Sequence, residues 1–222
     1  MDSSSLFRVR IRGELACFTR PELKTERVSY EIITPPAARG VLEALLWKPA
    51  ICWCVHRILI LSPPKLIQIR RNEVKSRASV PTLLRAARGG PPPDYYADED
   101  RAQRNTVALR DVDFAVESSF RMTSRRGPDD NVRKFEDMFE RRLLRGQFHM
   151  QPYLGCREFP AVVEPYDGTP PPWAEDRDWG QILHDVRYSR RGNVPVFFHA
   201  RMVHGVVEVP EWEARDDPAE SV

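Results

Sequence analysis

The sequence of 222 residues has few cysteines and histidines and no arrangement of them that is typical of a metal site. Its four cysteines form no C-x-x-C pair, and none of the five histidines has zinc-finger spacing to them. Cys52 and Cys54 alternate within an apolar strand pattern and therefore share one face. Such a pattern is typical of small buried residues in a reducing compartment. We therefore expect no metal and no cofactor.

Long apolar runs are also missing. The longest run, residues 50–61, is interrupted by His56 and Arg57 and is shorter than the ~20 residues that a membrane span needs. It predicts a buried strand. The first five residues, Met-Asp-Ser-Ser-Ser, lack the basic and apolar regions of a secretory signal. The sequence thus predicts a cytoplasmic protein without a membrane segment.

Several enzyme motifs are absent. The chain has no Walker motif, no G-x-G-x-x-G, no H-E-x-x-H and no G-x-S-x-G. The sequence therefore gives no support for nucleotide binding by a phosphate loop or for dinucleotide binding. It gives none for zinc-protease chemistry or for a serine nucleophile elbow.

Charge is present but unevenly distributed. The whole chain carries a formal charge of +2. Residues 1–150 hold 27 Lys and Arg against 19 Asp and Glu, a net +8, whereas residues 151–222 hold 7 against 13, a net −6. A basic first part suits a polyanion bound on one face of the molecule.

The first predicted strand covers residues 6–18. Its apolar positions alternate with Arg8, Arg10 and Arg12, so a half-exposed strand with one basic face is expected. That face could be a platform for nucleic acid or an ordinary solvated face, and the solvated face is the more common case.

Two helices follow from their capping signals. Thr34 and Pro35 open a helix over about residues 37–46, in which Gly40 suggests the close approach of another backbone. Asp129 or Asn131 caps a second helix that ends at Gly146.

The strands between and after these helices complete the plan. Residues 50–61 and 105–123 read as strands, the second bent or bulged near Asp111, and a further strand lies near Leu154. The Pro- and Gly-rich residues 76–104 read as a long mobile loop. Strands are also expected at residues 161–163, 182–188, 194–204 and 205–209.

The resulting order is βαββαβ followed by short strands. It predicts an α+β fold with a ferredoxin-like (RRM-like) N-terminal domain, residues 1–155, and a small antiparallel β-sheet domain, residues 156–222.

RNA can be cleaved without a metal when a protein orients the 2′-hydroxyl for attack on its own phosphodiester. The protein then supplies a proton acceptor, a cation for the pentacoordinate phosphate and a proton donor. The residues whose side chains are chemically suited to these three roles are Tyr30, Lys134 and His149. His149 follows the second helix at a turn, where an exposed surface histidine is an equally good interpretation.

Three segments of the chain resemble a known family. They are YEIITPPAARGVLEALLWKPA at residues 30–50, IRRNEV at 69–74 and PYLGCREFP at 152–160. Their order and spacing are similar to those of the type I-C (d-subtype) form of CRISPR-associated protein 5, across nearly the whole chain. The resemblance implies a metal-independent endoribonuclease that cleaves CRISPR repeat hairpins in precursor crRNA. It also implies that the protein remains as a subunit of the type I-C surveillance complex in antiviral defence.

Two positions depart from the family pattern. Members often carry a catalytic tyrosine just before Trp-Lys-Pro, where this chain has Leu46. Members also often carry Lys-His at the start of the second helix, where this chain has Lys134 and Phe135. Leucine and phenylalanine cannot transfer protons. We expect Lys134 to stabilise the phosphate charge, with Tyr30 or His149 as substitute proton handlers.

The basic residues expected to contact RNA are Arg39, Lys48, Arg70, Arg71, Arg133, Arg141 and Arg145. The expected partners are CRISPR repeat RNA, the other subunits of the surveillance complex and, non-specifically, double-stranded DNA, with a monomer when isolated. The alternative function is a non-catalytic crRNA-binding scaffold in the same complex, which the two departures favour.

Overall fold

The computed structural model describes residues 3–23, 25–93, 96–189 and 192–211. Its strands are β1 (Phe7–Ala16), β2 (Arg27–Val28), β3 (Ile51–Ile60), β4 (Lys65–Val74), β5 (Arg101–Met122), β6 (Val162–Pro165), β7 (Arg177–Arg187), β8 (Val194–Val203) and β9 (Val206–Glu208). Its helices are α1 (Pro35–Leu45), α2 (Val80–Ala87) and α3 (Val132–Leu144).

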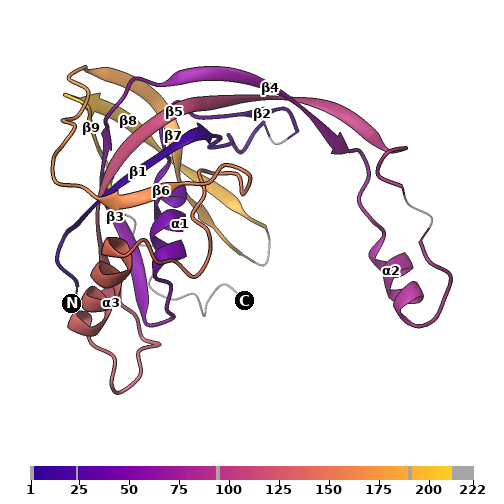
Figure 1. Cartoon of the computed structure of the whole chain (residues 1–222), viewed down its shortest axis with the longest axis horizontal. Helices are drawn as coiled ribbons and strands as arrows, with labels where there is room; N and C mark the ends of the chain where they lie inside the picture. Colours follow the sequence, from indigo (N-terminus) through magenta and orange to yellow (C-terminus); the bar gives the residue numbers. More distant parts are fainter. Residues whose placement is uncertain (1–2, 24, 94–95, 190–191, 212–222) are drawn as a thin grey trace.

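The protein is a mixed α and β protein built on one large, mostly antiparallel sheet (Figure 1). The strand order is β6-β1-β5-β3-β9-β8-β7, and β2 and β4 pair with β5 outside this path. β1 lies antiparallel to β5, with Val9 opposite Val116. β5 is a long strand, and Asp111 within it has a φ of 51°. The predicted bend near Asp111 is therefore confirmed.

The predicted helix caps are largely confirmed. Thr34 is the N-cap residue of α1, and the helix begins at Pro35, slightly earlier than predicted. The Oδ1 atom of Asn131 accepts a hydrogen bond from the Lys134 N–H at 2.9 Å, which caps α3. Gly146, with a φ of 61°, follows the end of α3. None of the helices in the described part of the chain is long and apolar enough to cross a membrane.

Aromatic side chains join α3 to the sheet. Phe139 of α3 packs against Phe7 of β1 and Trp53 of β3, with ring centroids 4.8 and 4.5 Å apart. Phe120 of β5 stacks near Phe7, and all four rings are buried. The Trp53 indole N–H donates to the carbonyl of Leu46 at 2.9 Å, so its polar group is satisfied inside the core.

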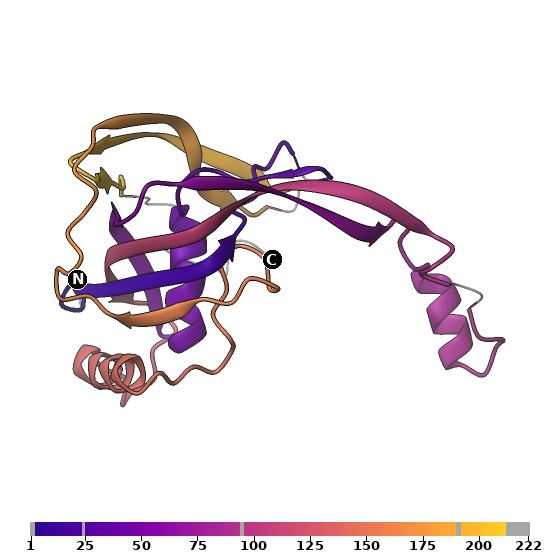
Figure 2. The ribbon, with the colours of Figure 1, turned by 45° about the horizontal axis from the view of Figure 1, so that its top comes forward.

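A long hairpin leaves the body of the molecule. β4 pairs with the first half of β5, from Lys65 opposite Arg110 to Val74 opposite Arg101, and α2 lies at its tip (Figures 1 and 2). This differs from the loop predicted over residues 76–104, because Val80–Ala87 forms α2 and β5 already begins at Arg101. The loop was predicted because this segment is rich in proline. Pro81, however, lies in the first turn of α2, where proline is compatible with a helix.

The C-terminal strands extend the same sheet. β7, β8 and β9 lie close to the predicted strands, and β9 pairs with β3, with Ile58 opposite Val207. The strand expected near Leu154 is absent from the described structure, where Tyr153 and Pro160 form only an isolated bridge. Gly155, with a φ of 81°, turns the chain there, and β6 is the strand that pairs with β1.

Candidate nucleic-acid interface

The basic face of β1 is neutralised by acidic side chains on neighbouring strands. Arg8 pairs with Glu117 at 2.9 Å, and Arg10 pairs with Asp113 at 2.6 Å. Arg12 reaches Glu164 of β6 at 3.3 Å. Cross-strand pairs of this kind stabilise the sheet modestly. These contacts favour the interpretation of the β1 face as an ordinary solvated surface.

A second basic region lies where α1 ends and α3 begins. Trp47 directly follows the α1 cap residue and is 56% exposed, and Lys48 comes next and is also exposed. The Lys134 ammonium contacts the Asp130 carboxylate at 2.9 Å. Hydrogen bonding from Lys134 lowers the pKa of Asp130, and the charge of Lys48 acts in the same direction. Lys48 and Lys134 therefore share one surface, next to an exposed aromatic ring.

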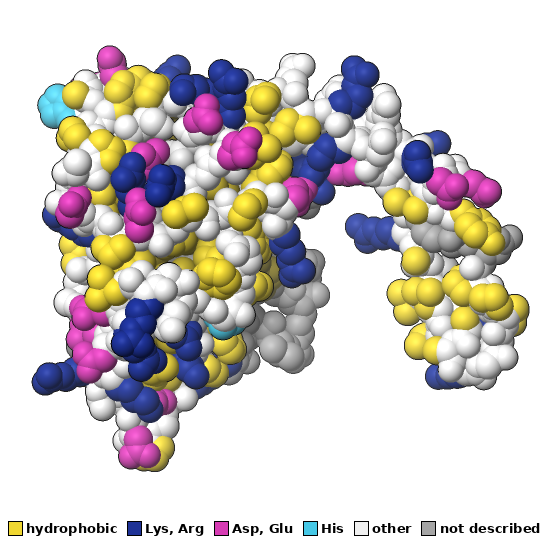
Figure 3. Space-filling model, in the orientation of Figure 1, with side chains coloured by type: hydrophobic (Ala, Val, Ile, Leu, Met, Phe, Trp, Pro, Cys, Tyr) yellow, Lys and Arg dark blue, Asp and Glu magenta, His cyan; other side chains and the backbone are white. Residues whose placement is uncertain are grey.

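Further cations continue along α3. Arg133, Arg141 and Arg145 are exposed. In Figure 3, Lys and Arg side chains gather over α3 and the connection before it, at the lower left of the molecule. Five of the predicted RNA-binding and catalytic cations thus lie on α3, at its cap or near its first turn, namely Lys48, Arg133, Lys134, Arg141 and Arg145.

The two departures from the family pattern are core residues. Leu46 is fully buried, and its carbonyl accepts the Trp53 indole N–H. Phe135 is 2% exposed and packs edge-on to Phe120 with ring centroids 6.3 Å apart. Both side chains are therefore buried, and the Lys134 ammonium lies over the Phe135 ring, 5.7 Å from its centroid.

The structure does not bring Tyr30, Lys134 and His149 together. Tyr30 precedes α1 and is 1% exposed, with the Arg20 guanidinium 4.5 Å from its ring centroid. Burial raises the pKa of the Tyr30 hydroxyl. His149 is exposed beyond the far end of α3, and its backbone N–H donates to the carbonyl of Ala44 at 3.1 Å. Tyr30 and His149 thus lie at opposite ends of α1.

Two of the predicted RNA-binding arginines are engaged with carboxylates. Arg39 forms two hydrogen bonds with the buried Asp185 of β7, at 2.9 and 3.2 Å. Arg71 bonds Glu73 at 3.1 Å and contacts Glu158. Arg70, next to it on β4, is exposed. Arg39 and Arg71 would have to leave these partners to contact a phosphate.

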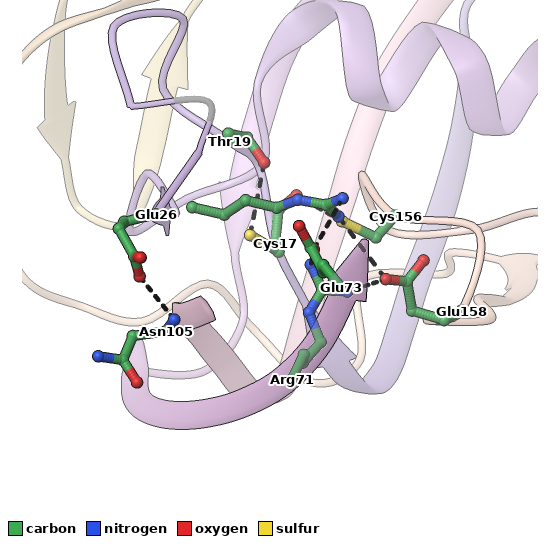
Figure 4. A network of polar contacts seen from close by, with 9 residues as sticks. Cys17, Thr19, Glu26, Arg71, Glu73, Asn105, Cys156 and Glu158 are labelled. Carbon is green, nitrogen blue, oxygen red and sulfur yellow. Dashed lines mark hydrogen bonds and ion pairs between the residues drawn. The ribbon is translucent and has the colours of Figure 1, made fainter. Parts of the chain in front are cut away.

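The three segments that carry the family resemblance converge on a second site. Arg71 of the second segment contacts both Glu73 on the same strand and Glu158 of the third segment, and Arg27 pairs with Glu73 at 3.4 Å (Figure 4). Arg27 also donates to the Cys156 sulfur at 3.3 Å. These contacts hold residues 156–158 against β2 and β4.

Cys17 and Cys156 form a buried thiol pair in this network. A hydrogen bond from Cys156 lowers the pKa of Cys17 against the opposing effect of burial, with smaller contributions from Thr19 and from the charges of Arg27 and Arg71. The pKa of Cys156 is raised in turn. Both cysteines are free. In the described part of the chain, no three His, Cys, Asp or Glu side chains are grouped so as to hold a metal ion.

Next to this network is a cavity of about 290 Å³. It is lined by residues of the first and third resemblance segments and by two residues that follow β1. Its lining residues are Phe18, Thr19, Thr34, Pro36, Ala37, Gly40, Tyr153 and Gly155. The expected close backbone approach at Gly40 is wrong, because no atom lies within 4 Å of a Cβ built there. Gly40 instead opens the surface of α1 onto the cavity.

Sequence reasoning missed the cavity and Trp47. The cavity residues come from three distant segments and include no charged group, so no local pattern indicates them. The sequence signal that was present is Gly155: a Cβ there would lie 2.1 Å from the Cys17 carbonyl oxygen, so only glycine fits.

Comparison with known proteins identifies the class. The family model described as "CRISPR-associated protein (Cas_Cas5)" matches residues 7–210. This α+β chain is therefore a CRISPR-associated protein. It belongs to the Cas5d family.

Two relatives are similar in sequence to this chain over nearly its whole length. The protein from Mannheimia succiniciproducens named "CRISPR pre-crRNA endoribonuclease Cas5d" is 42% identical over 94% of this chain and 96% of its own length. The protein of the same name from Thermus thermophilus is 40% identical over 91% of this chain and 90% of its own length.

Solved structures share the fold. The crystal structure of a CRISPR-associated protein has a TM-score of 0.72 at 21% identity, covering 98% of this chain and 97% of that one. The crystal structure of a functionally uncharacterized protein from Streptococcus mutans has a TM-score of 0.69 at 20% identity, and the match covers 95% of each chain.

Proposed function

We propose that this protein is a metal-independent endoribonuclease that binds and cleaves CRISPR repeat hairpins in precursor crRNA. The observation that carries the proposal is the identity of 40% or more, over at least nine tenths of each chain, with two relatives named pre-crRNA endoribonucleases. We further propose that it stays bound to its product as a subunit of the type I-C surveillance complex, in the cytoplasm. Isolated, it is a monomer, with weak non-specific affinity for double-stranded DNA.

The proposed framework is ferredoxin-like in residues 1–155. The order β6-β1-β5-β3, all antiparallel, with α1 between β1 and β3 and α3 between β5 and β6, supports this assignment. β6 falls just beyond the proposed boundary at residue 155, and β9 pairs with β3, so the proposed C-terminal β-sheet domain shares its sheet with the first.

The proposed reaction is attack of a 2′-hydroxyl on the adjacent phosphodiester. Lys134, with Lys48 beside it, would stabilise charge on the pentacoordinate phosphate, because a preorganised cation is worth most where charge develops. The exposed Trp47 offers a ring on which an unpaired base can stack. No metal takes part in this scheme.

The two candidate proton donors or acceptors, Tyr30 and His149, lie away from Lys134. Tyr30 is buried and its hydroxyl pKa is raised, so it would serve as a proton donor only after an opening of the core. His149 is exposed and follows the last turn of α3, whereas Lys134 lies in the first turn, and these two ends of the helix are about 15 Å apart along the axis at 1.5 Å per residue. His149 is therefore the better of the two proton handlers only if the RNA spans α3.

The alternative function is a non-catalytic crRNA-binding scaffold. The burial of Leu46 and Phe135, where family members often carry proton-transferring residues, favours it. Incubating the purified protein with repeat RNA from the CRISPR array of the source genome separates the two. Binding with cleavage supports the endoribonuclease, binding without cleavage supports the scaffold, and no binding contradicts both.

A further inference from the structure

We propose that the cavity beside α1 receives one unpaired nucleobase of the bound RNA. This inference rests on the proposed function and adds a binding site to it. The volume of about 290 Å³ lies near the lower end of small-molecule sites, which suits a single ring system. A base within a duplex is stacked on its neighbours and cannot enter a cavity, so the occupant comes from a loop, a bulge or an end of the RNA.

The walls of the cavity are suited to a flat ligand. Phe18, Pro36 and Ala37 supply apolar surface. Gly40 lies inside a helix, where glycine costs roughly 1 kcal/mol relative to alanine, and nothing packs against it. A side chain at this position would fill the space in front of α1, so the glycine keeps the cavity open.

Hydroxyl groups supply hydrogen bonds. Thr34 is 4% exposed, and its side chain does not cap the helix although it occupies the N-cap position. The Thr19 hydroxyl is within hydrogen-bond distance of the Cys17 sulfur, at 3.5 Å, and a hydroxyl can both donate and accept. Together with Tyr153, these residues offer donors and acceptors that rotate to suit the edge of a base.

The helix N-terminus argues for a neutral base rather than a phosphate. Anions bind at helix N-termini through free backbone N–H groups. Here the first two helical residues are Pro35 and Pro36, which have no N–H, and the N–H of Ala38 already bonds the Thr34 carbonyl at 2.9 Å. Among the residues that the structure describes, those that line the cavity carry no charged side chain.

Two arginines follow cavity-lining residues closely in the chain. Arg20 directly follows Thr19, and the exposed Arg157 is two residues beyond Gly155. This distribution fits a nucleotide whose base enters the neutral cavity while its phosphates remain outside near arginines.

The test is a double-mutant cycle between the protein and the RNA. The RNA is the repeat of the source array, intact or with a single abasic nucleotide at each unpaired position in turn. The proteins are wild type, Gly40→Leu, which fills the cavity, and Thr34→Val, which removes the hydroxyl. Thr82→Leu, which adds leucine to an exposed position of α2 without a change of charge, is the matched control. Circular dichroism and Tm confirm that each variant is folded.

The expected result is one position at which the abasic RNA binds wild type about 10-fold or more weakly, as for a lost stacked base. At that position Gly40→Leu should bind intact and abasic RNA equally, Thr34→Val should show a reduced difference, and Thr82→Leu should match wild type. Undiminished binding of intact RNA by Gly40→Leu, or no sensitive position in wild type, would overturn the cavity proposal while the proposed function stands. If the wild-type protein binds no repeat RNA, the result contradicts both the cavity proposal and the proposed function.

Discussion

The ammonium of Lys134 lies 2.9 Å from the carboxylate of Asp130, one helical turn earlier in the chain. Both groups are at the start of α3, where Asn131 caps the helix and the turn containing Trp47 and Lys48 comes alongside. The ion pair holds Lys134 at the surface in one orientation. The proposed activity depends on this lysine more than on any other side chain.

Replacing Lys134 tests its role in charge stabilisation. We expect Lys134→Ala to slow single-turnover cleavage of repeat RNA by about 100-fold or more, the usual effect of removing one preorganised donor. Arg133→Ala, which removes a neighbouring exposed charge, should lower affinity slightly and leave the rate at saturation unchanged. Equal saturating rates for Lys134→Ala and wild type would remove Lys134 from the mechanism.

The variant Phe135→His restores the histidine that family members often carry after the lysine. We expect no gain in cleavage, because the side chain at this position is 2% exposed and packs on Phe120. Burying an imidazole among aromatic rings should lower the free energy of unfolding by about 2 kcal/mol or more. Denaturant unfolding measures the loss, and faster cleavage by this variant would contradict the assigned position of residue 135.

Two glycines at the cavity should respond oppositely to alanine. Gly155→Ala should destabilise the protein by more than about 2 kcal/mol, because its φ is 81° and the new Cβ would collide with the Cys17 carbonyl. Gly40→Ala should be neutral or stabilise by up to about 1 kcal/mol, because it adds a good helix former in open space. Thermal unfolding of both variants checks the pair, and similar losses for both would contradict the described cavity wall.

The Glu158 network should be sensitive to acid. Partial burial tends to raise the pKa of Glu158, but its backbone hydrogen bond and the charges of Arg71 and Arg27 outweigh this and lower it below 4.5. The stabilisation is thus present above pH 4.5 and is lost as the pH falls through the lower, folded-state pKa. Because the side chain is 46% exposed, Glu158→Gln should cost at most about 1 kcal/mol at pH 7.

The measurement is urea unfolding of Glu158→Gln at pH 7 and pH 3, with Glu140→Gln on the exposed face of α3 as the control. The difference from wild type should shrink at pH 3, and the control should show little difference at either pH. A loss that is equal at both pH values would mean that Glu158 acts without its charge.

Local signals in the sequence predicted most of the regular elements. The Asn131 cap, the bend near Asp111 and the alternation in β1 each depend on a few neighbouring residues, and each is present in the structure. The hairpin and α2 were missed because proline marks both loops and helix starts. The strand near Leu154 was misplaced because the φ of Gly155 and its contact with Cys17 depend on a distant segment.

The candidate site was less accessible from the sequence. Residue type alone suggested Tyr30 as a proton handler, but its burial under Arg20 is a tertiary property. The same is true of Arg39 and Arg71, whose carboxylate partners lie far away in the chain. Lys48 and Lys134 were chosen from the sequence independently, and only the structure shows that they share one surface.

Analysis of the RNA ends tests the central claim most directly. Wild-type protein is incubated with repeat RNA in excess EDTA, and the upstream product is examined by mass spectrometry. Attack by the 2′-hydroxyl without a metal predicts efficient cleavage and a 2′,3′-cyclic phosphate. Binding without any cleavage, or a 3′-hydroxyl that forms only when a divalent cation is supplied, would contradict the proposed activity.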